Sequence, residues 1–422
     1  MTTSQKIIFR FFQQTVILLI LYVISALVAG VKFLAADDPL LTVLPYNQAN
    51  ALANVLLNLT VLTGLIGGGL YMAAQRRINL PVLRLSGIIW TVLLIISVLA
   101  GLFGLLGGRS LLELPLVLNG LLIIGLVAVL LAIVPSIRVP LVQLWALGLV
   151  LAIIAVLIGL LPPSDYLQDR GLRALAVGLQ MNIAYPLMAL TLGYWLMHRF
   201  SDLTPAWLEN DIYIAAGLVL LAGVCLTFPR MQAAADWVIN VGNLATVLAP
   251  LFYLLVIARC YPALTQRNGT HTLAAHWFTL SILLFFLGFG LVAAVQLAPA
   301  VRPYTIGTRL ADLQSTLASL AAVVMSLGVV NQAAAELRGQ NWRVTGLTPF
   351  WLVSVGILGG GLALAGAGIV QVYLERLLSI GYLDTQALLV PLYIGWVMAL
   401  ITLLLGIVLY ALGFWSHRPH RS

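Results

Sequence analysis

Long uninterrupted runs of apolar residues, separated by short polar segments, dominate the chain. The runs lie near residues 13–34, 49–74, 82–107, 111–135, 140–162, 172–197, 211–228, 236–260, 274–298, 306–330, 346–372 and 387–414. Crossing a hydrocarbon core of about 30 Å takes roughly 20 apolar residues in a helix, so each run can span a membrane. The runs do not alternate apolar and polar residues as membrane strands do. The pattern predicts an all-α polytopic membrane protein of about twelve transmembrane helices.

Composition strengthens this interpretation. Hydrophobic residues make up 62% of the chain and charged residues only 8%, against roughly 25% charged residues in soluble domains. The lipid bilayer is therefore the expected partner. No polar segment is long enough to fold by itself, so residues 1–422 are expected to form a single transmembrane domain. The net charge of +8 does not indicate a nucleic-acid partner, because the basic residues are spread over the loops.

The distribution of Lys and Arg predicts the orientation, since these residues are enriched in cytoplasmic loops. If the N-terminus is cytoplasmic, the inner segments hold most of the basic residues and the outer segments most of the acidic ones. The inner basic residues are Lys6, Arg10, Arg76, Arg77, Arg84, Arg138, Arg199, Arg259, Arg267, Arg338, Arg343, Arg418 and Arg421. Both termini are expected to be cytoplasmic, with the protein in a bacterial-type inner membrane.

Glycines recur at spacings typical of close helix packing. They are Gly64 and Gly68, Gly104 and Gly108, and a cluster within residues 356–368. In lipid, small residues let helix backbones approach closely. Packing within one bundle is the simpler interpretation, and a dimer or partner seam on the eleventh helix is the alternative.

Several segments occur in the order found in one family of membrane enzymes. A span ending in Gly288-Phe289-Gly290 is followed by the segment 304–309, YTIGTR; earlier lie the segment 62–71, LTGLIGGGLY, and the segment 236–243, DWVINVGN. These segments resemble helices nine and ten, two and eight of subunit I of the haem–copper oxidase superfamily. The resemblance is to the branch that contains C-family cytochrome oxidases and nitric oxide reductases, and it covers most of the chain.

The resemblance implies a twelve-helix core that carries two haems and copper. In the family, six histidines hold these groups, because imidazole ligates haem iron axially and also suits copper. Carried over to this sequence, the ligand positions fall near Ala53 on helix two, Leu179 or Gln180 on helix six, Cys225 and Leu226 on helix seven, and Gln314 and Thr316 (or Asp312 and Gln314) on helix ten. None of these positions holds a histidine.

The complete set of histidines leads to the same interpretation. The chain has five, fewer than the six that the family uses, at positions His198, His271, His276, His417 and His420. All five fall in segments expected on the inner side, whereas the resemblance places the metals in the outer half. The chain is therefore expected to be a degenerate member that binds neither haem nor copper and has no catalytic residues. The vacated space is expected to be repacked or to hold a lipid or quinone.

Polar residues at membrane depth are the remaining candidates for a site, because each costs free energy unless it is paired. Asp312, Gln314 and Arg309 could form an outer-side proton or cation site, although a simple Asp312–Arg309 pair one turn apart is the plainer interpretation. Asn54 and Asn58 share one face of helix two. Hydrogen bonds between helices are the favoured role for this pair, with a ligand site as the alternative.

Three functions remain open. The first is a non-catalytic subunit, a pseudoenzyme, with a structural or accessory role among other subunits of a respiratory or electron-transfer complex. The second is a catalytic terminal oxidase or nitric oxide reductase with atypical ligands. The third is a secondary transporter, which is disfavoured because the sequence shows neither an internal repeat nor charges near the membrane midplane.

Overall fold

A computed structural model describes most of the chain as helices. The described residues are 1–35, 45–107, 114–162, 164, 166–227, 236–266, 272–298, 301–305, 308–339 and 346–416. The α-helices are α1 (Thr3–Leu34), α2 (Tyr46–Ala74), α3 (Leu80–Leu102), α4 (Leu116–Ile133), α5 (Pro140–Gly159), α6 (Tyr166–Val177), α7 (Tyr185–Phe200), α8 (Pro205–Thr227), α9 (Asp236–Thr265), α10 (Thr272–Phe285), α11 (Ala293–Leu297), α12 (Arg302–Thr305), α13 (Arg309–Leu337), α14 (Leu347–Val372) and α15 (Tyr382–Ser416). Shorter segments of tighter or wider winding are η2 (Val134–Ser136), η3 (Gly178–Ala184), η6 (Phe286–Val292) and η7 (Tyr373–Leu377).

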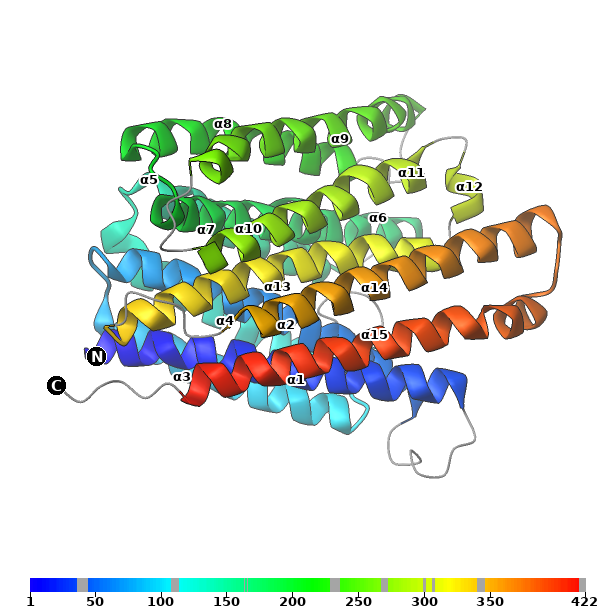
Figure 1. Ribbon diagram of the computed structural model, residues 1–422, viewed down its shortest axis with the longest axis horizontal. Coiled ribbons are helices and arrows are strands. Elements are labelled where there is room, and N and C mark those ends of the chain that lie inside the picture. Colours follow the sequence, from blue (N-terminus) through cyan, green and yellow to red (C-terminus); the bar gives the residue numbers. More distant parts are fainter. Residues whose placement is uncertain are drawn as a thin grey trace.

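The long helices run side by side along one direction, and the start of α1 and the end of α15 lie at the same end of the bundle, which we call the end with the termini (Figure 1). Within the described residues, twelve helical stretches are long and apolar enough to cross a membrane. The predicted all-helical, twelve-span architecture is therefore confirmed. Because successive spans reverse direction, α1 ends, and α2, α13 and α15 begin, at the end of the bundle opposite the termini.

Helices α2 and α13 form the centre of the bundle. The most apolar stretch of α2 is entirely buried, and that of α13 is 89% buried, whereas the corresponding stretch of α3 is only 39% buried. The two central helices approach closely because α2 presents glycine: a Cβ on Gly64 would lie 2.6 Å from the Cβ of Ser326. This is the small-residue packing that the sequence predicts.

The glycine cluster in residues 356–368 also packs within the bundle. A Cβ on Gly356 would lie 2.7 Å from the backbone nitrogen of Leu403, and one on Gly406 would lie 2.8 Å from that of Val353. Helices α14 and α15 therefore contact each other through their backbones. The packing interpretation applies to Gly356, which faces this intramolecular contact.

Gly104, one member of a predicted glycine pair, lies outside a helix. Helix α3 ends at Leu102, short of the expected boundary at residue 107, and Gly104 lies beyond it with a φ of +71°. Glycine adopts this left-handed conformation without the steric cost that a side chain would add. Gly104 thus ends a helix, and its predicted partner Gly108 lies outside the described residues.

A wider, π-helical turn interrupts two membrane helices, and a third such segment, η7, ends the eleventh span. Segment η3 interrupts the sixth span just before Pro186, and η6 interrupts the ninth span at the Gly288-Phe289-Gly290 sequence. Such turns insert an extra residue into the helix and are frequent at functional sites. Segment η3 contains the predicted ligand positions Leu179 and Gln180, and η6 packs through Gly288 against α13, which carries the positions predicted on the tenth span.

Candidate functional site

Two of the predicted ligand positions, Ala53 on α2 and Thr316 on α13, line one cavity of about 200 Å³. We call it the interhelix cavity. Its walls come mainly from α1, α2, α13 and α15, in the half of the bundle opposite the termini. The lining residues are Tyr22, Ala26, Ala29, Phe33, Tyr46, Asn50, Ala53, Asn54, Leu57, Asn58, Met181, Arg309, Ser315, Thr316, Ser319, Leu364, Tyr393 and Trp396.

Arg309 and a group of aromatic rings form one side of the interhelix cavity. The guanidinium carbon of Arg309 lies 5.2 Å from the ring centre of Phe33 and 5.6 Å from that of Tyr393. Its Nε donates to the Tyr393 hydroxyl at 3.4 Å, and its backbone N–H donates to Oε1 of Gln371 at 3.2 Å. The tyrosine hydroxyl in turn donates to Gln386 at 2.9 Å. These contacts hold a positive charge against aromatic faces, which attract it.

Three asparagines of α2 form another wall of the cavity, because positions 50, 54 and 58 are one helical turn apart. Nδ2 of Asn58 donates to the backbone carbonyl of Asn54 at 3.0 Å. Its Oδ1 has no hydrogen-bond partner among the described residues, although the residue is only 5% exposed. Leaving such a buried acceptor unpaired costs about 1–3 kcal/mol.

The sequence favoured hydrogen bonds between helices as the role of Asn54 and Asn58, and this prediction is wrong for Asn58. Its bond stays within its own helix instead of joining two helices. The helical spacing placed Asn54 and Asn58 on one face correctly. Only the packing of α1, α13 and α15 around that face decided that it meets a cavity.

The ligand positions predicted on the sixth and seventh membrane spans lie in η3 and α8, away from the interhelix cavity and in closely packed surroundings. Leu226 on α8 is fully buried, Cys225 is a half-buried free thiol, and Leu179 lies in η3. A Cβ on Gly223 of α8 would overlap the backbone carbonyl of Asn182 in η3. Here the backbones of α8 and η3 are in direct contact.

The two ligand positions predicted on the tenth membrane span lie on different sides of that helix, α13. Thr316 lines the interhelix cavity. Gln314 is 2% exposed, and its carbonyl oxygen would lie 3.4 Å from a Cβ on Gly288 of η6. The side chain of Asp312 lies outside the described residues, so the proposed pairing with Arg309 and the proton or cation site stay predictions.

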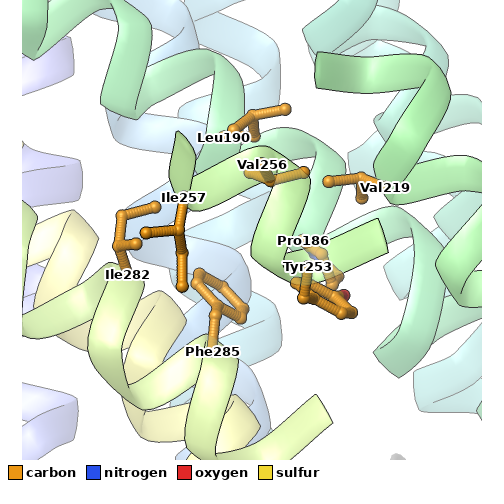
Figure 2. A pocket seen from close by; sticks show the side chains of 8 residues that line it. All are labelled: Pro186, Leu190, Val219, Tyr253, Val256, Ile257, Ile282 and Phe285. Atoms are coloured by element: carbon orange, nitrogen blue, oxygen red, sulfur yellow. The ribbon is translucent and has the colours of Figure 1, made fainter. Parts of the chain in front are cut away.

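A second, much smaller cavity of about 20 Å³ lies between α7, α8, α9 and α10. Figure 2 shows the side chains that surround it, and most are aliphatic or aromatic carbon. The hydroxyl of Tyr253 has no hydrogen-bond partner among the described residues. A volume of roughly 10–15 Å³ is enough for a single water, so this space has room for about one.

The described histidines lie far from the interhelix cavity along the bundle. His198 is near the end of α7 and His276 is near the start of α10, so both lie at the end that holds the termini. The Nδ1 of His276 bonds to the carbonyl of Thr272 at 2.6 Å. No group of three His, Cys, Asp or Glu within the described ranges could hold a metal ion.

The interhelix cavity does not fit a haem. Neither Ala53 nor Thr316 carries an axial ligand, which in haem proteins is His, Cys, Met or Tyr. Met181 and Tyr393 do line the space, but Met181 accepts a contact from Ser319 at 4.0 Å, and the Tyr393 hydroxyl is bonded to Gln386. Sites for drug-sized molecules occupy about 300–1,000 Å³. A haem is at least that large, whereas this cavity measures about 200 Å³.

Comparisons with known proteins agree with the resemblance in the sequence. The chain is 22% identical over 421 residues to a subunit of the nitric oxide reductase of Stutzerimonas stutzeri, an alignment that covers 89% of this chain and 86% of that protein. No protein-family model matches the sequence.

The fold was also compared with solved structures. It superimposes on the cryo-EM structure of a haem–copper terminal oxidase dimer with a TM-score of 0.79, covering 99% of this chain and 84% of that one at 12% sequence identity. The chain thus shares its fold with a haem–copper terminal oxidase and is similar in sequence to a subunit of a nitric oxide reductase. Taken together, these matches identify it as a multi-pass membrane protein of the haem–copper oxidase subunit I superfamily.

Proposed function

We propose that the chain is a non-catalytic subunit with the haem–copper oxidase fold, which serves a structural or accessory role in a respiratory or electron-transfer complex. The observation that carries this proposal is the side-chain chemistry at the ligand positions. Ala53 and Thr316, the pair nearest to the interhelix cavity, offer one methyl group and one hydroxyl. Neither group is an axial haem ligand.

The packing on the other side of α13 supports the same proposal. Gly288 packs against α13, and Gly223 packs against the backbone of η3. At these two contacts the backbones are too close for a planar macrocycle to lie between the helices. A catalytic oxidase or nitric oxide reductase with atypical ligands is the competing function.

A visible spectrum separates the two functions. The full chain, purified in detergent, is expected to show no haem bands in a dithionite-reduced minus oxidised spectrum and less than one haem per ten chains in a pyridine haemochrome assay. Metal analysis of the same sample should find no stoichiometric copper. One or more haems per chain would overturn the proposal and favour the catalytic alternative.

We also propose that the end of the bundle with both termini faces the cytoplasm of a bacterial inner membrane. The excess of Lys and Arg in the segments at this end supports the orientation. Alkaline phosphatase fused after Ser416 should stay inactive in a bacterial host, because the enzyme folds only after export. Fusion of the same enzyme after Leu160, between the fifth and sixth spans, should give activity. The reverse result would contradict the orientation.

A further inference from the structure

Positive charge gathers where the start of α1 meets the ends of α13 and α15, at the end with the termini. Lys6 and Arg10 are exposed and one turn apart on α1, and Arg338 follows the last residue of α13. The first acidic residue of the sequence is Asp37 and the last is Asp384, so α1 has none and α15 has one, in its first turn. We call this group of three basic residues the basic corner.

The one acid near this end of α13 is already occupied. The carboxylate of Glu336 accepts from the hydroxyl of Tyr71 at 2.6 Å and from Nε2 of Gln332 at 3.1 Å. Its other contact is with Arg199, whose Nε lies 3.3 Å from Oε1. Within the described residues, no ion pair neutralises any member of the basic corner. Its charge is therefore available to an anion from outside the chain.

Arg338 is held in place by the ends of two other helices. Its guanidinium carbon lies 5.1 Å from the ring centre of Phe9 and 5.2 Å from that of Phe414. Nη2 donates to the backbone carbonyl of Phe414 at 2.7 Å, whereas Nη1 has no hydrogen-bond partner among the described residues. Burial lowers the pKa of Arg338. A nearby anion offsets the cost of keeping a charge in these surroundings.

The surroundings of the basic corner match the depth of lipid head groups. Trp415, next to Phe414 at the end of α15, is 41% exposed. Tryptophan is enriched where the membrane meets water. Deeper along the bundle, Ile17 of α1 and Leu412 of α15 are exposed apolar side chains. An anion that carries acyl chains therefore fits both the charge and the adjoining apolar surface.

We propose that the basic corner binds one anionic phospholipid, with its phosphate at Lys6 and Arg10 and its negative charge attracted by the half-buried Arg338. The acyl chains lie along the exposed apolar residues of α1 and α15. Basic residues close to a membrane surface attract anionic head groups, and each adds to the attraction. This inference does not rest on the proposed function, because the corner lies at the opposite end of the bundle from the interhelix cavity.

The test compares two lipids that differ in head-group charge. The full chain, purified in detergent and delipidated, is titrated with phosphatidylglycerol and with phosphatidylcholine of the same acyl chains, and bound lipid is counted by native mass spectrometry. The first phosphatidylglycerol is expected to bind roughly tenfold more tightly, because phosphatidylcholine carries its own compensating cation. Equal affinities would overturn the proposal. Inorganic phosphate that binds as tightly as phosphatidylglycerol would assign the corner to a soluble anion and would also overturn it.

Variants then locate the site. Arg338→Gln should reduce the preference for phosphatidylglycerol to about threefold or less, and Arg338→Lys should keep it, because the charge remains. The double variant Lys6→Gln and Arg10→Gln changes only exposed side chains, so it keeps the test decisive if Arg338→Gln does not fold. Arg138→Gln is the matched control, since it removes an exposed charge at the same end, between η2 and α5. A preference that is lost in the control, or kept in the double variant, would contradict the assignment.

Discussion

Replacing Arg259 with leucine is expected to lower the free energy of unfolding by about 2–3 kcal/mol. Arg259 on α9 donates to Oδ1 of Asp211 on α8 at 2.8 Å, and the Asp211 side chain is only 3% exposed. The hydroxyl of Tyr194 on α7 donates to the other carboxylate oxygen at 2.5 Å. Without the guanidinium, a buried carboxylate keeps a single neutral donor in a region of low dielectric constant.

The expected loss is below the 3–5 kcal/mol typical of wholly buried pairs, because the Arg259 side chain is 45% exposed and partly screened. Equilibrium unfolding in mixed micelles measures the change. The matched control is Arg173→Leu, which removes a 2.7 Å pair with Asp169 whose side chains are 44% and 26% exposed. That loss should stay within about 1 kcal/mol.

A double variant identifies the cause of the loss. Adding Asp211→Asn to Arg259→Leu removes the uncompensated charge and is expected to recover part of the stability, since the remaining amide still accepts from Tyr194. If Arg259→Leu costs no more than Arg173→Leu, or if the double variant is less stable than Arg259→Leu alone, buried charge is not the reason.

Replacing Gly223 with alanine is expected to cost about 1–3 kcal/mol. A Cβ at this position on α8 would overlap the backbone carbonyl of Asn182 and would lie 2.5 Å from Cγ1 of Ile183. A rotamer change cannot relieve a clash with backbone, so α8 and η3 have to move apart. The expected result is a lower unfolding free energy in the same mixed-micelle assay.

Gly217→Ala on the same helix is the control. Nothing lies within 4 Å of a Cβ built at that position. Alanine is favoured over glycine in a helix interior by up to about 1 kcal/mol, so this variant should be neutral or stabilising. Similar losses in both variants would show that contact between α8 and η3 is not what Gly223 provides.

The helical architecture could be predicted from the sequence to within a few residues at most boundaries. The apolar run near 49–74 corresponds to α2, which spans Tyr46–Ala74, and the run near 346–372 corresponds to α14, which spans Leu347–Val372. Membrane spans are predictable because an apolar run of sufficient length has one stable solution in lipid, a helix with its own backbone paired. The end of α3 was misplaced because Gly104 adds a left-handed turn after an apolar segment.

Only part of the candidate site could be predicted from the sequence. The spacing of Asn54 and Asn58 placed both on one face of α2. Their neighbours could not be inferred, because Phe33, Arg309 and Tyr393 come from three other helices. Hydrophobicity does not select among helix pairs in lipid, where packing and hydrogen bonds decide the association.

The sequence by itself therefore determined a polytopic helical bundle and its resemblance to haem–copper oxidases. It also determined that two of the family's ligand positions hold Ala53 and Thr316 instead of histidine. These properties depend on local composition and residue identity. The tertiary structure alone decided that those two positions border a cavity of about 200 Å³, while Gly223 brings the backbones of α8 and η3 into contact. Small side chains at such positions can leave a cavity or can let the helices come into contact. Which of the two occurs depends on how closely the surrounding backbones can approach, and that is a property of the whole bundle.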